Sequence, residues 1–133
     1  MGTKKMLNKL AELHKKCFPD KPWSASDFAD LKKSGCEIMA SENGFLVWRT
    51  VADEAEIITI GVAPLMRRNG IAEALILLME QELKKSGVVN VFLEVSEVNT
   101  PAKKLYEKCG FKPTGKRPKY YDGVDAIIMT KRL

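Results

Sequence analysis

The sequence predicts a single mixed α/β domain in which helices flank a central, mostly antiparallel sheet. The chain has 133 residues, of which 45% are hydrophobic and 29% charged, so it can bury a core without disulfides or metals. No repeat, linker or low-complexity segment divides residues 1–133. Patterns of helical and strand periodicity follow in the order helix, helix, three strands, helix, strand, helix, two strands, which is not a strictly alternating α/β arrangement.

Two short helices come first. Apolar side chains recur at helical spacing across residues 3–18 and form one stripe. The tripeptide Lys-Pro-Trp at residues 21–23 ends this helix. Ser24 and Asp27 resemble a capping box, in which each side chain bonds the backbone N–H of the other, and so predict a second helix to about Lys33.

Three strands follow and form an antiparallel meander. Their predicted ranges are residues 37–41, 45–52 and 56–62. Asn43-Gly44 favours a tight hairpin turn between the first two strands, because both residues tolerate positive φ, and Asp53-Glu54 can turn the next pair.

The second half predicts two helices and three strands. Residues 71–86 form a helix that is apolar over more than half of its circumference, as in a helix packed on a sheet. Gly87 ends it, and residues 89–95 read as a short, largely buried strand. The remaining elements are a helix over 101–109 that starts with Thr100-Pro101, a strand from Phe111 with an irregularity at 115–118, and a last strand over 124–131 after an Asp122-Gly123 hairpin turn.

Charge favours an anionic partner. The net charge is +5, and residues 103–132 hold nine Lys/Arg against three Asp/Glu. A phosphorylated cofactor or a nucleic-acid-rich assembly would suit such a surface, although plain solvation explains any single lysine equally well.

Other classes of protein are disfavoured. Three scattered cysteines and one histidine do not form a zinc pattern, so we expect no metal. Glu73 and Glu80 interrupt the longest apolar run, and the N-terminus lacks a signal core, so we expect a cytoplasmic protein that does not enter the membrane.

The segment 67–72 (RRNGIA) lies between a strand and a helix. Its backbone N–H groups and the positive end of the helix attract phosphate oxygens, and Arg67 and Arg68 add charge-assisted hydrogen bonds. Because Gly70 and Ala72 are both small, an anion can approach the backbone at these two positions. The segment matches neither the Walker nor the dinucleotide-binding pattern. A basic helix cap without a ligand explains it equally well.

Read with the preceding Val62-Ala63-Pro64, this segment resembles the acetyl-coenzyme-A loop of the GNAT family of N-acetyltransferases, whose pattern is Gln/Arg-x-x-Gly-x-Gly/Ala. Three further segments agree in order and spacing: Leu93-Glu94-Val95, then Asn99, then residues 105–111 (LYEKCGF).

Within the family, the chain resembles the RimI-type ribosomal-protein alanine N-acetyltransferases. Pro22-Trp23-Ser24, Tyr120-Tyr121 and residues 125–129 support this resemblance, which covers nearly the whole chain. It implies the GNAT acyl-CoA N-acyltransferase fold. That fold usually begins with a strand, but only about five residues precede Met6, so the first strand should be short or missing.

The resemblance implies acetyl-CoA as cosubstrate. Ile60, Gly61 and Val62 would offer backbone groups to the pantetheine arm, and Gly61 would let the chain approach closely. The residues that we expect to contact the coenzyme are Ile60, Gly61, Val62, Arg67, Arg68, Asn69, Gly70, Ile71, Ala72 and Asn99.

Acetyl transfer from a thioester to an amine needs a base, an oxyanion donor and an acid. Glu94 is a carboxylate on an otherwise apolar strand, where burial would make it a stronger base. A place at the strand end, facing solvent, is the alternative. The resemblance favours Glu94 as the base, acting directly or through water, and the N–H of Val62 is our candidate oxyanion donor.

The resemblance makes Tyr106 the acid that protonates the coenzyme A thiolate. A phenol titrates near ~10 and a thiol near ~8.5, so the transfer is feasible once the groups are positioned. A lone helical tyrosine is otherwise an ordinary core residue. Asn99 likewise could be a helix cap, a coenzyme ligand or both.

The acceptor should be an amine. Trp23, Tyr120 and Tyr121 could line its groove or simply fill space. An α-amine titrates near ~8 and a lysine amine near ~10.4, so the former is more easily deprotonated. With the resemblance, this favours a protein N-terminus, possibly that of a ribosomal protein, without direct nucleic-acid binding. Lysine, a small amine or aminoacyl-tRNA as acceptor, and a non-catalytic acyl-CoA-binding protein, remain alternatives. The oligomeric state is not predicted.

Overall fold

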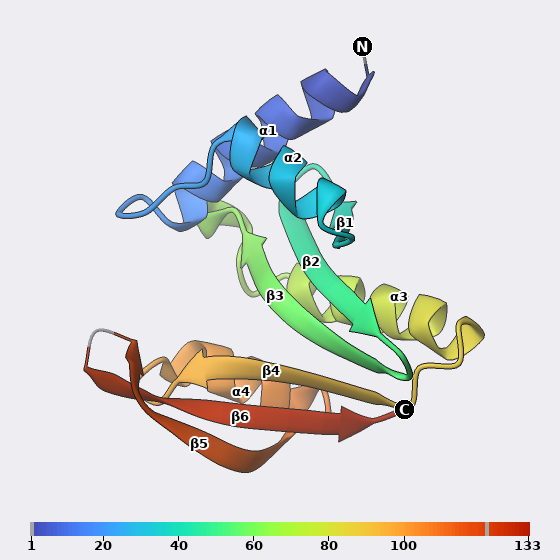
Figure 1. Ribbon diagram of the computed structural model, residues 1–133. Helices are drawn as coiled ribbons and strands as arrows, with labels where there is room; N and C mark the ends of the chain where they lie inside the picture. Colours follow the sequence, from blue (N-terminus) through green and yellow to red (C-terminus); the bar gives the residue numbers. More distant parts are fainter. Residues whose placement is uncertain (1, 122) are drawn as a thin grey trace. The chain divides into compact units, whose positions relative to one another are not determined.

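The computed structural model describes residues 2–121 and 123–133, with the side chains of residues 3–120 and 123–133 (Figure 1). These residues form a mixed six-stranded sheet in the order β1-β2-β3-β4-β6-β5. Strands β3 and β4 pair in parallel, whereas β1–β2, β4–β6 and β5–β6 are antiparallel. The mixed, mostly antiparallel sheet predicted from the sequence is therefore confirmed.

The element order also agrees with the prediction. The elements are α1 (Gly2–Cys17), α2 (Ala25–Lys33), β1 (Glu37–Ala40), β2 (Gly44–Val51), β3 (Glu54–Val62), the short 3-10 helix η1 (Pro64–Met66), α3 (Ile71–Lys85), β4 (Asn90–Ser96), α4 (Thr100–Lys108), β5 (Lys112–Tyr121) and β6 (Val124–Arg132). In the described part of the chain, no strand precedes α1. None of the described helices is long and apolar enough to cross a membrane.

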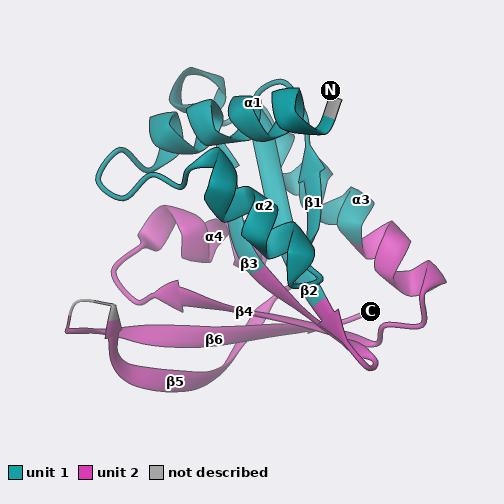
Figure 2. Ribbon diagram, turned by 45° about the horizontal axis from the view of Figure 1, so that its top comes forward, with its two compact units in different colours: residues 1–49, 58–79 teal, residues 50–57, 80–133 magenta. Residues whose placement is uncertain are grey.

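The chain forms two compact units, which Figure 2 shows in different colours. Unit 1 comprises residues 1–49 and 58–79, and unit 2 comprises residues 50–57 and 80–133.

In unit 1, α1, α2, β1 and β2 enclose an apolar core. Its fully buried aromatic residues are Phe28 and Phe45. The start of α2 is fixed by the predicted capping box, since Ser24 N donates to Asp27 Oδ2 at 2.8 Å and Asp27 N donates to Ser24 Oγ at 3.1 Å. These two bonds satisfy backbone donors that a helix start otherwise leaves open.

Gly44 has a different role from the one predicted. It is the first residue of β2 rather than a turn residue with positive φ, and Ser41 N donates to its carbonyl at 2.8 Å. A Cβ on Gly44 would lie 2.9 Å from Ile71 Cγ2 and 3.1 Å from Leu75 Cδ1. The glycine therefore allows α3 to pack closely on the strand.

In unit 2, Leu93 of β4 and Met129 of β6 are fully buried and lie opposite each other in the sheet. The predicted irregularity of β5 is present as register shifts between Pro113 and Gly115 and between Arg117 and Tyr121. The predicted turn residue Asp122 lies outside the described residues.

A buried ion pair joins three elements of unit 2. Lys131 Nζ on β6 lies 3.0 Å from both carboxylate oxygens of Glu80 on α3, and donates to the carbonyl of Cys109 at 2.7 Å. Glu80 is only 4% exposed. Lys131 thus compensates a carboxylate that would otherwise be buried without a counter-charge.

Candidate functional site

The loop between β3 and α3 has a conformation that suits an anion. Arg68 and Gly70 both have positive φ, +67° and +76°. The first α-helical hydrogen bond of α3 runs from Ala74 N to Gly70 O at 3.0 Å. The amides of Ile71 and Ala72 therefore lie in the first turn, where a helix has no carbonyl to accept from them.

The side chain of Arg67 is used inside the protein. Its Nε donates to the carbonyl of Val62 at 3.1 Å. Its guanidinium also hydrogen-bonds the Cys17 thiol and opposes the effect of burial, which raises the pKa of that thiol. The sequence predicts that both arginines face a phosphate. Both side chains are exposed, but Arg67 bonds to the protein, whereas no hydrogen bond or ion pair to the described residues holds Arg68.

Asn69 stabilises the same loop. Its Nδ2 donates to the carbonyl of Met66 at 3.0 Å. The bond links the end of η1 to the residue before Gly70, and so helps to hold the loop ahead of α3.

Gly61 is required by packing. A Cβ at this position would lie 2.6 Å from Phe45 Cε1, which is closer than real side chains approach, and 3.1 Å from Cys17 Sγ. The Phe45 ring therefore approaches Gly61 closely, and the contact of Gly61 with the coenzyme stays a prediction. No local pattern predicts this contact.

In unit 2, Glu94 lies in the middle of β4, opposite Ile128 of β6. Its side chain is 13% exposed, and Arg117 Nη2 of β5 lies 2.6 Å from Glu94 Oε1. The predicted burial on an apolar strand is therefore present, together with a cation. The Arg117 guanidinium also lies 4.6 Å from the centroid of the Tyr120 ring, within cation–π range.

Arg117 was not found from the sequence. It is one of several basic residues in a segment that reads only as an irregular strand, and 22 positions separate it from Glu94. Next to it, Lys116 Nζ lies 3.6 Å from Glu97 and 3.5 Å from Asp125. Two neighbouring cations of β5 therefore pair with different carboxylates. Arg117 pairs with Glu94, and Lys116 pairs with the more exposed Glu97 and Asp125.

Asn99 and Tyr106 both belong to α4. Asn99 is the N-cap, since its Oδ1 accepts from Ala102 N at 3.3 Å. The sequence had placed the cap at Thr100, one residue too late. Tyr106 is 7% exposed and meets the Phe111 ring edge-on at 6.0 Å between centroids.

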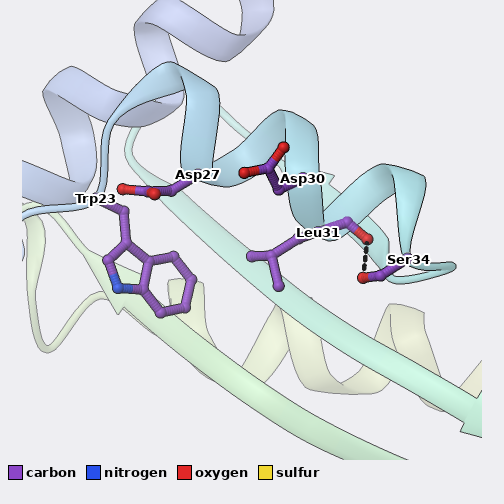
Figure 3. A pocket seen from close by; sticks show the side chains of 5 residues that line it. All are labelled: Trp23, Asp27, Asp30, Leu31 and Ser34. Atoms are coloured by element: carbon purple, nitrogen blue, oxygen red, sulfur yellow. Dashed lines mark hydrogen bonds between the residues drawn. The ribbon is translucent and has the colours of Figure 1, made fainter.

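The Trp23 side chain fills space, which is one of the two roles considered for it. Its indole packs against the core of unit 1, and it also lines a pocket of ≈ 450 Å³ with Asp27, Asp30, Leu31 and Ser34 (Figure 3). Tyr120 is 50% exposed. The side chain of Tyr121 lies outside the described residues. The described residues contain no group of three or more His, Cys, Asp or Glu side chains that could hold a metal ion.

Residues 6–111 match the model of the acetyltransferase (GNAT) family. The chain belongs to this family. It is 38% identical over 117 residues to the ribosomal protein bS18-alanine N-acetyltransferase of Escherichia coli (strain K12). The matched region covers 81% of this chain and 79% of that protein.

Solved structures agree with this GNAT assignment. The crystal structure of the ribosomal-protein-S18-alanine N-acetyltransferase from Escherichia coli superposes with a TM-score of 0.84 at 31% identity, covering 96% of this chain and 88% of that one. A putative streptothricin acetyltransferase from Bacillus anthracis, solved in complex with acetyl coenzyme A, has a TM-score of 0.64 at 29% identity. The superposition covers 68% of this chain and 56% of that one.

These comparisons confirm the GNAT fold, the resemblance to the RimI-type enzymes and the enzyme class. The chain is an acetyl-CoA-dependent N-acetyltransferase, and acetyl-CoA is its cosubstrate.

Proposed function

We propose that this GNAT enzyme transfers the acetyl group of acetyl-CoA to the N-terminal α-amine of a protein, of the alanine-starting ribosomal type. The observation that supports this acceptor is the 38% identity to a ribosomal protein bS18-alanine N-acetyltransferase over 81% of the chain. An N-terminal amine also loses its proton more readily than a lysine amine, which lowers the demand on the base.

The β3–α3 loop is the proposed binding site for the pyrophosphate of the coenzyme. At Gly70, a Cβ would meet no heavy atom within 4 Å, so the backbone is open to a ligand. The first-turn amides of Ile71 and Ala72 and the exposed Arg68 guanidinium supply donors and positive charge. In this proposal Arg67 and Asn69 position the loop through bonds to the protein.

The acyl end of the coenzyme would be held by backbone groups of β3. Ile60, Gly61 and Val62 are the proposed contacts, with the N–H of Val62 as oxyanion donor. Asn99 uses its Oδ1 as a helix cap, which leaves the amide NH₂ of this exposed side chain to donate to the coenzyme.

Glu94 is the proposed general base. Its ion pair with Arg117 stabilises the carboxylate, which must be ionised to accept a proton. A protonated α-amine is itself a cation, so the Glu94 carboxylate attracts it. The proton then moves to Glu94 directly or through water, and the amine attacks the thioester carbonyl.

Tyr106 is the proposed acid. As the C–N bond forms and the C–S bond breaks, its phenol gives a proton to the coenzyme A thiolate. Burial on α4, against Phe111, restricts the orientation of the ring. Trp23, Tyr120 and Tyr121 are the proposed acceptor-side residues.

The acceptor is tested by acetyl-CoA consumption with three amines. They are a peptide that starts with alanine, the same peptide with a blocked N-terminus, and free lysine. We expect turnover with the first only. Equal turnover of the blocked peptide excludes α-amine specificity, turnover of lysine indicates a different amine acceptor, and coenzyme binding without turnover of any amine indicates a non-catalytic acyl-CoA-binding protein.

The catalytic roles are tested with Glu94→Gln and Tyr106→Phe. Each should lower kcat about 10²–10⁴-fold, the usual contribution of a general acid or base, while acetyl-CoA still binds. Glu97→Gln is the matched control, because it removes a nearby carboxylate that pairs with Lys116 instead of Arg117. An unchanged kcat in either test variant would show that the assignment is wrong.

A further inference from the structure

The pocket of ≈ 450 Å³ in unit 1 lies along one side of α2 (Figure 3). It is lined from α2 and its C-cap by Asp27, Asp30, Leu31 and Ser34, and the indole of Trp23 lines it just before the helix begins. Residues three and four positions apart share one side of a helix. Binding pockets usually have volumes of about 300–1,000 Å³, so this one suits part of a ligand, such as one side chain of a peptide.

The charged groups of this pocket are all negative. Asp27 and Asp30 supply two carboxylates, and none of the described basic residues lines the pocket. Even the two lysines of α2, Lys32 and Lys33, are not among its lining residues. The chain as a whole has a net charge of +5. The pocket is therefore a local region of the opposite sign, which favours a cation at close range.

The two carboxylates differ in what the fold requires of them. Asp27 belongs to the capping box, where its Oδ2 accepts from Ser24 N at 2.8 Å. Within the described part of the chain, no hydrogen bond or ion pair holds the exposed Asp30 side chain. Aspartate is a poor residue inside a helix, and two like charges at this spacing destabilise it. Asp30 therefore carries a cost that the helix does not offset and that a bound cation would relieve.

The indole of Trp23 has a fixed orientation at the end of the pocket. It stacks on the His14 ring, with 4.7 Å between centroids and 13° between planes, and it meets the Phe28 ring edge-on at 5.5 Å. Part of the indole still lines the pocket and is open to a ligand. A guanidinium or ammonium within about 6 Å of an indole ring gains a cation–π interaction. Trp23 is thus a second feature that suits a cation.

The same rings connect the pocket to the end of β3. The His14 and Phe45 rings lie 5.6 Å apart between centroids, and a Cβ on Gly61 would lie 2.6 Å from Phe45 Cε1. Trp23 is therefore joined to Gly61 through two intervening rings, all within unit 1. An extended peptide advances about 3.3 Å per residue. A peptide whose amine lies at Val62 can therefore reach the pocket within about five residues.

We propose that this pocket binds a lysine or arginine side chain at about the third to fifth position of the acceptor protein. The inference rests on the proposed function, because it takes an N-terminal α-amine as the acceptor. The cation pairs with Asp30 and Asp27, stacks on the Trp23 indole and packs its apolar stem on Leu31. Arginine is preferred, because its planar guanidinium both stacks on a ring and forks to a carboxylate. The enzyme thus selects acceptors by a side chain remote from the reacting amine.

The test uses peptides that start with alanine and contain serine and glycine elsewhere, apart from one variable residue at position 3, 4 or 5. This residue is arginine, glutamine or glutamate, and kcat/KM for acetyl transfer is measured for each peptide. At one or more positions, arginine should exceed glutamine about 3–10-fold, which is what one exposed ion pair and one cation–π contact supply. Glutamate should be the poorest of the three, and salt should reduce the preference.

Two substitutions of Asp30 test the pocket itself. Asp30→Asn should lower the preference for arginine over glutamine to less than about twofold. Asp30→Lys should reverse the order, so that the glutamate peptide exceeds the arginine peptide. Asp53→Asn is the matched control and should keep the preference, since Asp53 is an exposed aspartate in the turn between β2 and β3, outside the pocket.

Equal turnover of the arginine and glutamine peptides at all three positions would overturn the proposal, and so would equal losses of preference in Asp30→Asn and Asp53→Asn. A failure of the proposed function looks different, because no alanine-starting peptide is then acetylated. In that case binding of the same peptides with an acetylated N-terminus decides. The arginine peptide should shift the NMR signal of the Trp23 indole N–H at about 1 mM, and an equal shift with the glutamine peptide would count against the pocket.

Discussion

The imidazole of His14 accepts a hydrogen bond through Nδ1 from the backbone N–H of Trp23 at 3.0 Å, and its ring stacks on the indole at 4.7 Å between centroids. His14 is 3% exposed. The bond needs a neutral imidazole, since a protonated Nδ1 is a donor. The segment that leads into α2 is therefore held by a histidine that must stay uncharged.

The first prediction concerns pH. Burial lowers the pKa of His14 below its ordinary value, and the Asp27 carboxylate partly opposes the shift. The unfolded chain then binds this proton more readily than the folded one. Stability should be full above about pH 6.5, the value for a free histidine, and should fall as the pH drops from there toward the folded pKa.

This prediction has a direct measurement, because His14 is the single histidine of the chain. Proton NMR of its Cε1–H should titrate below the range of a free histidine. His14→Phe keeps an aromatic ring but leaves the Trp23 N–H without its acceptor. It should cost about 1–3 kcal/mol and flatten the stability profile below about pH 6.5. A normal or raised pKa for His14 would contradict the argument.

The second prediction separates two adjacent cations. Arg117→Gln removes the ion pair with Glu94 and should lower kcat/KM about tenfold, with acetyl-CoA affinity unchanged. Lys116→Gln removes pairs with Glu97 and Asp125 instead and is the matched control. Steady-state kinetics with the acceptor peptide distinguish them. Equal effects of the two variants would mean that net charge alone matters.

The third prediction concerns the neighbouring arginines of the β3–α3 loop. Arg68 has φ +67°, a conformation in which asparagine is strained less than most residues. Arg68→Asn should therefore keep or raise the melting temperature while raising the KM for acetyl-CoA about 3–10-fold, an effect that weakens with salt.

Arg67→Gln is the comparison for Arg68→Asn. It removes the bond to the Val62 carbonyl and should lower stability by about 0.5–1.5 kcal/mol. A rise in KM for Arg67→Gln with an unchanged melting temperature, and none for Arg68→Asn, would reverse the two roles.

The fourth prediction tests why residue 61 is glycine. Gly61→Ala would place a Cβ 2.6 Å from the Phe45 ring, and such overpacking usually costs about 1–3 kcal/mol. Adding Phe45→Leu should recover part of that loss, although Phe45→Leu alone is destabilising. Urea unfolding of the four proteins gives the coupling energy. Strictly additive effects would show that the Phe45 ring is not what requires glycine.

Periodicity was sufficient to predict the elements of this fold. The capping box at Ser24 and Asp27 and the irregularity of β5 could be predicted because each is a local pattern. The cap of α4 was placed one residue late, because Asn99 and Thr100 are both good cap residues and local sequence does not choose between them.

Features that depend on distant contacts were not accessible from the sequence. The position of Arg117 beside Glu94 follows from the pairing of β5 with β6 and of β6 with β4. The local sequence marks Gly44 as a turn residue, and it does not predict that side chains from remote segments pack against Gly44 and Gly61. The position of β1 at one end of the strand order depends on the whole sheet, which periodicity does not predict.

The ion pair of Lys131 has a consequence for a protein that binds an acylating agent. Acetyl-CoA can react with lysines without catalysis, but only through the uncharged amine. Glu80 and the Cys109 carbonyl both accept hydrogen bonds from Lys131 Nζ, which restrict its approach to an acyl group. Acetylation there would leave the Glu80 carboxylate buried without its counter-charge. The same contacts that join α3, α4 and β6 therefore also protect this lysine from the chemical reactivity of the enzyme's own cosubstrate.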